Sequence, residues 1–276
     1  MTELSEVAKH YSSTALLDRI EAALAEVGAR RPLDLETLAL FDEFHIGGRR
    51  ATHHLLENLK VSAGNKVLDL GCGLGGPARY VAKTSGARVT GLDLSADFVA
   101  TGNALTGQAL MADLVELRQG SILDMPFDDN QFDVAYMIHV GMNISDKPAL
   151  AAEVARVLKP GGVFGIFDVM AVDDAELSYP VPWASGPEQS ALCPPEAYRD
   201  ALTDAGFNIR SETDRSAFAL DFFARMMARQ NKVEGQPVLG LHLVMGPDAG
   251  LKISNMVAAL HGGQIAPVEM IARLGS

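Results

Sequence analysis

The sequence is short of cysteine, of long apolar runs and of clustered basic residues, and each shortage excludes a class of protein. Two cysteines, Cys72 and Cys193, cannot form a disulfide framework or a cysteine-rich metal cluster. No stretch of about 18 uncharged apolar residues predicts a transmembrane helix, and the opening stretch MTELSEVAKH does not resemble a secretory signal. We therefore expect a cytoplasmic, reduced protein that has no membrane partner and no metal site.

The charge balance excludes a further class. The formal net charge is −12, and the basic residues form no run longer than the pairs Arg30–Arg31 and Arg49–Arg50. Binding to nucleic-acid phosphates requires clustered basic residues, so we expect no nucleic-acid partner. The expected partner is a small molecule, and the expected assembly is a monomer or a homodimer.

The chain is organised around residues 67–78, VLDLGCGLGGPA. An apolar strand leads into a glycine-rich turn, and the turn opens a helix whose first turn accommodates Pro77. Gly71, Gly73 and Gly76 keep the spacing G-x-G-x-x-G, which lets backbone atoms approach a ligand where a Cβ atom would intrude. By itself this turn is compatible with any nucleotide.

Two carboxylates narrow the choice of ligand. Asp93 ends the strand RVTGLD, roughly 20 residues beyond the glycines, where a Rossmann-type fold places an acid for the ribose hydroxyls. Asp69 comes just before the first glycine, where it would repel the pyrophosphate of a dinucleotide. A carboxylate there suits a ligand with an ammonium and a sulfonium group, so the two acids favour S-adenosylmethionine (SAM) over NAD.

Strand and helix patterns alternate from about residue 61, which predicts a parallel sheet with helices on both faces. The predicted strands are residues 66–71, 88–93, 115–119, 132–139 and 163–169, with a helix after Ser95, a helix over 146–158 and a turn at 159–162. Ligands bind outside the carboxyl ends of the strands in such sheets. The candidate site therefore consists of residues 71–73, 93–94, 121–122 and the chain from His139 onward.

The segments outside this alternation are mostly helical. Apolar spacing predicts helices before residue 60 and over 194–205, 217–233 and 248–261, and strands over 207–213 and 264–274. Residues 171–195 hold five prolines and the only tryptophan, which predicts an irregular loop. The double glycine after residues 40–46 predicts a loop laid close to a ligand, or a plain helix connector with His45 on the surface.

Five motifs in this order resemble the class I SAM-dependent methyltransferases: VLDLGCGLGG, VTGLDLS, GSILDMPF, FDVAYMIHV and RVLKPGGV. The stretches GLGGPAR and FDEFHIGG are similar to the sarcosine/dimethylglycine N-methyltransferase-like group, and HVGMNI and PVPWA fit the same neighbourhood. The resemblance implies an α/β, Rossmann-like, seven-stranded and mostly parallel sheet with helices on both faces, and an antiparallel strand seven between strands five and six. It also implies a helical cap, made of residues 1–60 and of insertions at about 171–195 and 215–262 in a SAM-binding methyltransferase domain of residues 61–276.

Carried over position by position, the resemblance implies a SAM site, with S-adenosylhomocysteine as the product. Asp69 and the backbone of residues 71–73 would hold the methionine end, and Asp93 would hold the ribose hydroxyls. Leu94 would pack on the adenine, and Ser121 and Ile122 would address its edge, although many relatives have an aspartate where Ser121 stands. The full set of cofactor-binding candidates is Asp69, Gly71, Cys72, Gly73, Asp93, Leu94, Ser121, Ile122 and His139.

The candidates on the acceptor side are polar or aromatic residues outside the glycine turn. His139, Tyr11 and His45 are the candidate catalytic residues, since a protonated acceptor needs a general base. Asn143 and Trp183 are the candidate substrate contacts, and the indole of Trp183 offers a cation–π face to an ammonium. Structural alternatives stand beside these roles: packing for Tyr11 and Trp183, a purely structural histidine at position 139, and helix capping for Asn143.

The sequence therefore predicts a SAM-dependent methyltransferase that acts on a small molecule. The first acceptors to consider are amines such as sarcosine or dimethylglycine, and O- or C-methylation of another metabolite is the alternative. A SAM-binding protein without catalysis and an NAD(P)-dependent oxidoreductase are further alternatives, the last of them opposed by Asp69. Methyl transfer from a sulfonium is an in-line displacement that depends on alignment and water exclusion, so no metal is expected.

Overall fold

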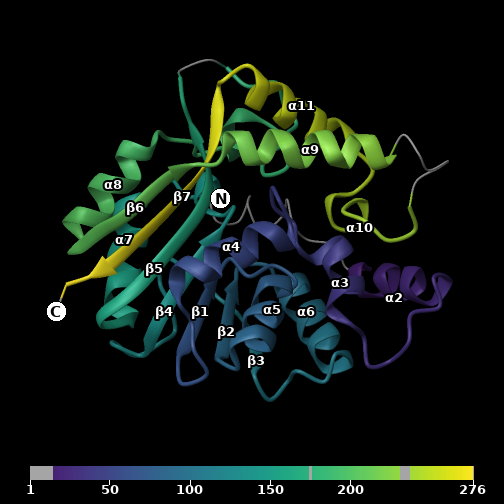
Figure 1. The fold of residues 1–276 in the computed structure, drawn as a ribbon, viewed down its shortest axis with the longest axis horizontal. Coiled ribbons are helices and arrows are strands. Elements are labelled where there is room, and N and C mark those ends of the chain that lie inside the picture. The colour runs from purple at the N-terminus through teal and green to yellow at the C-terminus, as the bar shows by residue number, and fades with distance from the viewer. Residues whose placement is uncertain (1–14, 174–175, 231–236, 276) are drawn as a thin grey trace.

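The computed structural model describes residues 15–173, 176–230 and 237–275. Within them, one seven-stranded sheet has the order β3-β2-β1-β4-β5-β7-β6 (Figure 1). Neighbouring strands among the first five are parallel, and β7 is antiparallel to both β5 and β6, so the predicted fold class is confirmed. The strands are β1 (Lys66–Leu70), β2 (Arg88–Asp93), β3 (Val115–Gln119), β4 (Phe132–Ile138), β5 (Leu158–Ala171), β6 (Phe207–Asp214) and β7 (Ile265–Leu274).

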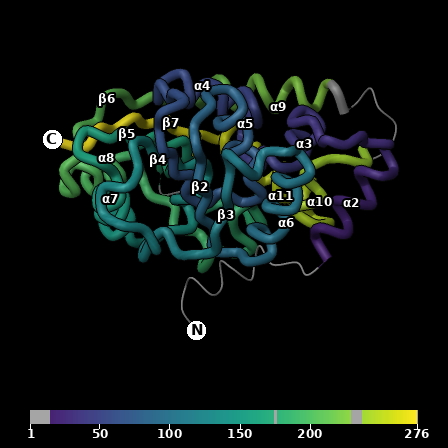
Figure 2. The backbone as a smooth tube through the Cα atoms, turned by 90° about the horizontal axis from the view of Figure 1, so that it is seen from below, coloured from purple at the N-terminus to yellow at the C-terminus, as the bar shows by residue number. Residues whose placement is uncertain are grey.

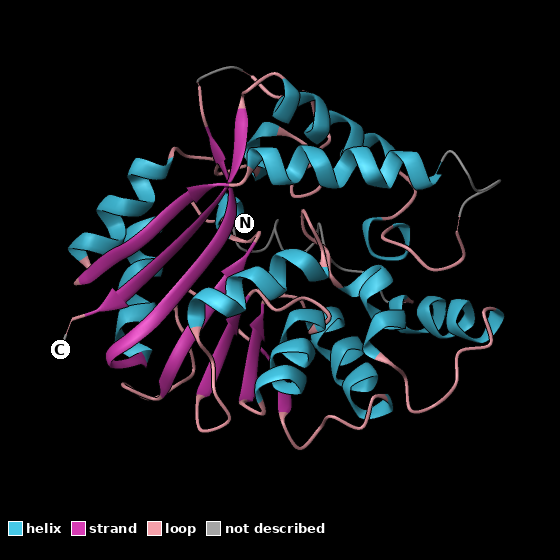
Figure 3. Cartoon of the chain, in the orientation of Figure 1, coloured by secondary structure: helices cyan, strands magenta, loops and turns pink. Residues whose placement is uncertain are grey.

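Helices cover both faces of this sheet, as Figure 3 shows. Helices α4 (Arg49–Leu59) and α5 (Gly76–Ser85) pack on one face, and α7 (Lys147–Val157) and α8 (Pro195–Asp204) pack on the other. Helix α6 (Ala96–Gln108) lies against β2 and β3. Because strands covered on both sides have no solvent face, β1 and β4 read as almost continuous apolar runs. Their burial stabilises the fold by about 25 cal/mol for each Å² of apolar surface.

The remaining helices gather at the carboxyl ends of the parallel strands. Helices α9 (Ser216–Gln230) and α11 (Ala249–His261) pack against each other across this end of the sheet (Figure 1). Helices α2 (Leu16–Glu26), α3 (Leu35–Asp42) and α10 (His242–Met245) form a second group, which Figure 2 shows on the opposite side of the molecule from β6 and α8. Each group has its own apolar cluster, separate from the clusters on the sheet faces.

The described part of the loop between β5 and α8 is irregular, as its prolines predict, and it is tightly packed. Trp183 is fully buried in the apolar cluster of α9 and α11, and its Nε1 donates to Ser190 Oγ at 3.0 Å. Asn143 Nδ2 donates to the carbonyl oxygens of Trp183 at 2.8 Å and of Gln189 at 3.1 Å. These bonds fasten the loop to the chain that follows β4.

Strand β5 is longer than predicted. The sequence predicts a turn at residues 159–162, whereas β5 begins at Leu158 and contains these residues. Phe132 pairs with Leu158 and Val134 pairs with Val163, so the extra residues form a bulge inside the strand. The ion pair of Lys159 Nζ with Asp133 Oδ1, at 2.5 Å, holds the bulge against β4. The prediction of a turn at this point was wrong, because β5 pairs with β4 both before and after these residues.

Side chains cap several helices by accepting backbone N–H groups that have no partner within the helix. Ser95 Oγ accepts from Phe98 N–H at 3.3 Å, which confirms the predicted cap of α6. Asp34 caps α3 and Asp146 caps α7 in the same way, each through a 2.8 Å bond. Across the described residues, none of these helices has both the length and the apolar character needed to cross a membrane.

A close approach between two segments requires glycine at position 76. A Cβ atom on Gly76 would lie 2.4 Å from the backbone oxygen of Asp42, whereas a Cβ atom on Gly107, in α6, would meet no atom within 4 Å. We expect Gly76→Ala to lower the free energy of unfolding by about 1–3 kcal/mol. The matched Gly107→Ala is expected to raise it by about 0.4–1 kcal/mol. Urea unfolding compares the two, and equal effects would contradict the close approach.

Candidate functional site

A pocket opens at the carboxyl ends of the parallel strands, where the sequence analysis places the ligand site. All nine cofactor-binding candidates line it: Asp69, Gly71, Cys72, Gly73, Asp93, Leu94, Ser121, Ile122 and His139. The aromatic residues Phe41, Phe44 and Phe98 and the aliphatic Val244 also line the pocket, and the sequence analysis missed them. They come from α3, the segment after it, α6 and α10, so no local motif marks them.

The glycine-rich turn presents its backbone to this pocket. The N–H groups of Gly71 and Cys72 donate to the carbonyl oxygen of Leu92, at 2.8 and 3.1 Å, which fixes the turn against β2. Gly73 has a φ of +52°, and a Cβ atom there would meet nothing within 4 Å. The space beside Gly73 is therefore open, as a ligand that approaches the backbone requires.

Asp93 is held in place by two backbone donors. Its Oδ2 accepts from Gly73 N–H at 2.8 Å, and its Oδ1 accepts from Ser95 N–H at 2.9 Å. Burial raises the pKa of this carboxyl above its usual value, while the two backbone bonds act in the opposite direction. Each carboxylate oxygen keeps a second lone pair, so the group can accept hydrogen bonds from a pair of hydroxyls.

Asp69 is a buried carboxyl whose stabilisation comes from the neighbouring Tyr136 hydroxyl, which lowers its pKa only in part against the effect of burial. The residue is 2% exposed. Burial raises the pKa of Asp69 to about 8, and the nearby carboxylate of Asp93 adds to this shift. A cation placed in the pocket would favour the charged form. The site therefore fits a ligand that carries an ammonium group.

The opposite end of the pocket is mostly apolar. Ile122 is buried, and Leu94 lines the same wall. Ser121 Oγ accepts from Leu123 N–H at 3.1 Å, which leaves its hydroxyl hydrogen free to donate. Burial raises the pKa of the Cys72 thiol well above its usual value, so this cysteine is a small lining residue and not a thiolate nucleophile.

A second pocket adjoins the first, and Phe44, His45 and His139 line both. The other described residues around the second pocket are apolar: Ile46, Met142, Pro182, Trp183, Phe222, Phe223, Met226, Leu241, Met245, Ile253 and Met256. No acidic residue, lysine or arginine is among them. The two pockets therefore differ in chemistry, and they meet at two histidines and a phenylalanine.

His139 lies at this junction with both ring nitrogens in hydrogen bonds. Nδ1 is 3.1 Å from the carbonyl oxygen of Phe167, so it must carry the hydrogen, and Nε2 accepts from Ile46 N–H at 3.3 Å. Burial lowers the pKa of His139 to about 3, and the ring is neutral at pH 7. These two hydrogen bonds link β4, β5 and the chain after α3. The bond from Ile46 N–H occupies the lone pair of Nε2, which a general base would need to accept a proton.

The ring of His45 lies 5.9 Å from the ring of His139, measured between centroids, and has different hydrogen-bond partners. Its Nε2 is 3.1 Å from both the carbonyl oxygen of Gly48 and Thr52 Oγ1, and 3.5 Å from a Glu43 carboxylate oxygen. Burial lowers the pKa of His45 to about 4. The predicted alternative of a surface histidine was wrong, because the side chain is only 3% exposed.

Asn143 lines the first pocket and Trp183 the second, but their polar atoms bond within the protein, as described above. Tyr11 lies outside the described residues. Within those residues, no group of three or more histidine, cysteine or acidic side chains is arranged to hold a metal ion.

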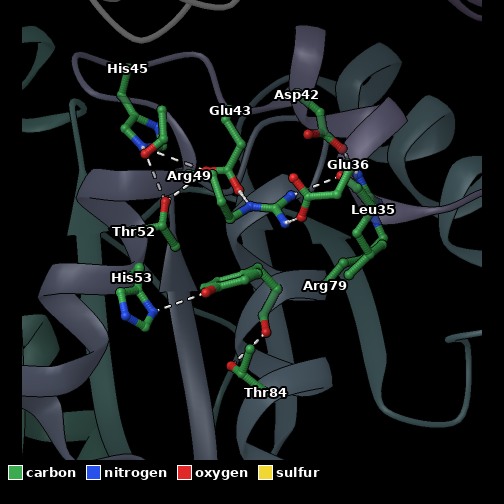
Figure 4. Close-up of polar contacts among 12 residues, drawn as sticks. Leu35, Glu36, Asp42, Glu43, His45, Arg49, Thr52, His53, Arg79 and Thr84 are labelled. Carbon is green, nitrogen blue, oxygen red and sulfur yellow. Dashed lines mark hydrogen bonds and ion pairs between the residues drawn. The ribbon is translucent and has the colours of Figure 1, made fainter. Parts of the chain in front are cut away.

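A buried charge network supports the junction, and the sequence analysis missed it. Arg79 and Asp42 are both buried and form an ion pair of 2.6 Å, and Arg79 also donates to Thr106 Oγ1 at 2.8 Å. Nearby, the buried Glu43 pairs with Arg49 at 2.5 Å (Figure 4). These pairs join α3, α4, α5 and α6, whose charged residues are far apart in the sequence.

The comparisons with known proteins fit this geometry. The protein family described as a methyltransferase domain matches residues 68–166, which run from within β1 through the glycine-rich turn, β2, β3 and β4 into β5. Residues 68–166 of this chain therefore belong to a methyltransferase domain. The fold of the chain matches geranyl diphosphate C-methyltransferase from Streptomyces coelicolor A3(2), with a TM-score of 0.71, 19% identity, and coverage of 99% of this chain and 98% of that one.

The methyltransferase domain also has curated relatives of two kinds. A sterol 24-C-methyltransferase from Gibberella zeae is 35% identical over 54% of this chain. A glycine/sarcosine/dimethylglycine N-methyltransferase from Actinopolyspora halophila is 30% identical over 82% of this chain. The chain spans 40% of the length of each relative. The relatives named for sterol and for amino-acid substrates thus differ in acceptor, while the domain is shared.

The raised pKa of Asp69 leads to a prediction about stability. The folded-state pKa of about 8 is above the unfolded value of 3.8, so the contribution of Asp69 to stability is lost as the pH rises between these values. We expect Asp69→Asn to raise the free energy of unfolding of the ligand-free protein at pH 8 by about 1–2 kcal/mol, since the amide stays neutral. The gain should shrink toward pH 4. Thermal unfolding measures this, with the exposed Asp113→Asn as control, and a loss of stability at pH 8 would contradict it.

Proposed function

We propose that the protein is a SAM-dependent methyltransferase whose acceptor is a small, largely apolar molecule. The observation that carries the proposal is the meeting of two pockets at Phe44, His45 and His139. One pocket has the open glycine turn and two carboxylates, and the other is apolar. Such a junction brings a polar methyl donor and an apolar acceptor end to end, as an in-line displacement requires.

The residues of the first pocket match the parts of SAM. Asp69 would pair with the ammonium group, and the backbone of residues 71–73 would lie along the methionine end. Asp93 would accept from both ribose hydroxyls, with Leu94 and Ile122 against the adenine and Ser121 at its edge. When bound there, SAM supplies an electrophilic methyl group, and the protein aligns and shields the reacting atoms.

The second pocket favours an apolar acceptor over sarcosine or dimethylglycine. Both amino acids carry a carboxylate, and no described residue around this pocket is a lysine or an arginine. Moving an unpaired carboxylate out of water is strongly unfavourable. An apolar acceptor instead gains about 25 cal/mol for each Å² buried against the phenylalanine and methionine side chains. The relationship to the sterol methyltransferase supports the same choice.

The segments that resemble cap insertions supply most of this pocket. Residues 215–262 contribute Phe222 and Phe223 from α9 and Met256 from α11, and residues 171–195 contribute Trp183. The segment before residue 60 contributes Phe44, His45 and Ile46. We infer that these three segments form the cap that selects the acceptor, while residues 61–170 hold the methyl donor.

The ribose assignment can be tested directly. We expect Asp93→Ala to weaken SAM binding roughly 10- to 100-fold, because hydrogen bonds to a charged group contribute about 1.5–3 kcal/mol. Titration calorimetry measures the affinity. Asp113→Ala, on the exposed surface after α6, is the control and should bind SAM normally. An unchanged affinity in Asp93→Ala would overturn the ribose role.

The acceptor class can be tested with labelled SAM and two metabolite pools, one extracted into organic solvent and one left in water. We expect label to enter compounds of the organic pool. Phe223→Arg should abolish that transfer and leave SAM binding intact, because it places a charge in the apolar pocket. Labelling of sarcosine or dimethylglycine alone would restore the amine alternative, and SAM binding without transfer to either pool would favour a non-catalytic protein.

A further inference from the structure

We propose that His45 is the general base of this site and that it selects an acceptor with a neutral O–H or N–H group on an otherwise apolar molecule. The inference rests on the proposed function, since it assigns the acceptor end of the same site. It depends on the tautomer of His45, which the surrounding oxygen atoms fix.

Three oxygen atoms surround Nε2 of His45. The carbonyl oxygen of Gly48, at 3.1 Å, can only accept a hydrogen bond. The Glu43 carboxylate lies 3.5 Å away and also accepts, and the Thr52 hydroxyl already donates its hydrogen to this carboxylate at 2.6 Å. Nε2 therefore carries the ring hydrogen, and the lone pair of the neutral ring is on Nδ1.

This lone pair has no partner among residues 15–173, 176–230 and 237–275. Within the described residues, every hydrogen bond of the His45 ring is made by Nε2 (Figure 4). The ring lines both pockets and lies 5.9 Å from His139. His139 offers no equivalent lone pair, because its Nε2 accepts from the backbone of Ile46 and its Nδ1 donates to Phe167. Of the two histidines at the junction, His45 is the one free to accept a proton.

The side chains around the second pocket determine which hydrogen-bond donor can bind to Nδ1 of His45. Apart from the two histidines, the described residues around the second pocket are apolar except for the indole of Trp183, whose N–H bonds to Ser190. A charged acceptor would find no counter-ion there. A neutral hydroxyl or amine N–H satisfies the Nδ1 lone pair and leaves the rest of the molecule among phenylalanine and methionine side chains.

In methyl transfer to a hydroxyl, the acceptor oxygen forms a C–O bond with the methyl carbon, and the electron pair of the breaking C–S bond stays on the sulfur of the SAM sulfonium. The O–H bond breaks, and its proton moves to Nδ1 of His45. The resulting imidazolium faces the Glu43 carboxylate through Nε2–H, as the acid of a catalytic triad faces its histidine.

The product loses the interaction that selected the acceptor. A methyl ether has no hydrogen to donate, so after transfer it leaves Nδ1 without a partner. An unpaired buried acceptor is unfavourable, and the product should therefore bind more weakly than the acceptor. This difference gives a test by binding that needs no knowledge of the natural acceptor.

The test uses 2-naphthol and its methyl ether, 2-methoxynaphthalene, as probes. Binding to the full-length protein with saturating S-adenosylhomocysteine is measured by ligand-observed NMR competition. We expect the wild-type protein to prefer 2-naphthol roughly tenfold, corresponding to one hydrogen bond. His45→Phe should remove the preference while keeping the affinity for 2-methoxynaphthalene. His53→Phe, whose side chain is 58% exposed on α4, is the matched control and should keep the preference.

A preference for 2-naphthol that survives in His45→Phe would overturn the assignment of His45, as would equal binding of both probes to the wild-type protein. If His45→Phe does not fold, nitrogen-15 NMR of the wild-type histidines decides, since an Nδ1–H tautomer of His45 contradicts the proposal. Failure of the wild type to bind S-adenosylhomocysteine or SAM in calorimetry would instead refute the proposed function.

Discussion

The site depends on buried charges that fix the segment between α3 and α4. The ion pair of Arg79 with Asp42 ties the end of α3 to α5, and Glu43 with Arg49 ties the following residues to α4. Because a buried charge without its partner costs about 3–5 kcal/mol, each pair constrains the segment strongly. Gly76 allows the end of α3 to approach within contact of α5. The result is that Phe44 and His45 stand between the two pockets in a defined orientation.

Two polar groups beside the first pocket, the carboxyl of Asp69 and the hydroxyl of Tyr136, lie in surroundings that disfavour them in the ligand-free protein. Asp69 Oδ2 and the hydroxyl of Tyr136 are both buried, and among the described residues the only stabilising side-chain hydrogen bond on Asp69 comes from this hydroxyl. Such groups destabilise a ligand-free fold, and the extensive apolar burial in the sheet offsets them. Their position beside an open glycine turn is consistent with a cation that pairs with Asp69 on binding. Groups disfavoured by their surroundings in this way concentrate at functional sites because function requires them there.

The two pockets are built from different parts of the chain. The first pocket lies at the ends of neighbouring parallel strands, which the fold brings together in every protein of this architecture, and α3, α6 and α10 add residues to its wall. The second is built from α9, α11, the loop before α8 and the segment after α3, which are separate in sequence. Under the proposed function, this division is consistent with one domain shared by relatives named for sterols and for glycine derivatives. Changes in the outer segments alter the acceptor pocket and leave the strand ends intact.

The sequence alone predicted the seven-stranded sheet, with an antiparallel strand seven between strands five and six, and it named residues that line the first pocket. Alternating strand and helix patterns have few topological solutions, and Asp69, Gly73 and Asp93 lie within one short βαβ unit, so local spacing fixed their proximity. It did not determine the bulge in β5, the Arg79–Asp42 pair or the apolar walls around Trp183, because these depend on contacts between distant segments. The roles of His45 and His139 were equally open in the sequence. Only the tertiary structure separates them, because the oxygen atoms and backbone N–H groups around each ring decide which nitrogen keeps a free lone pair.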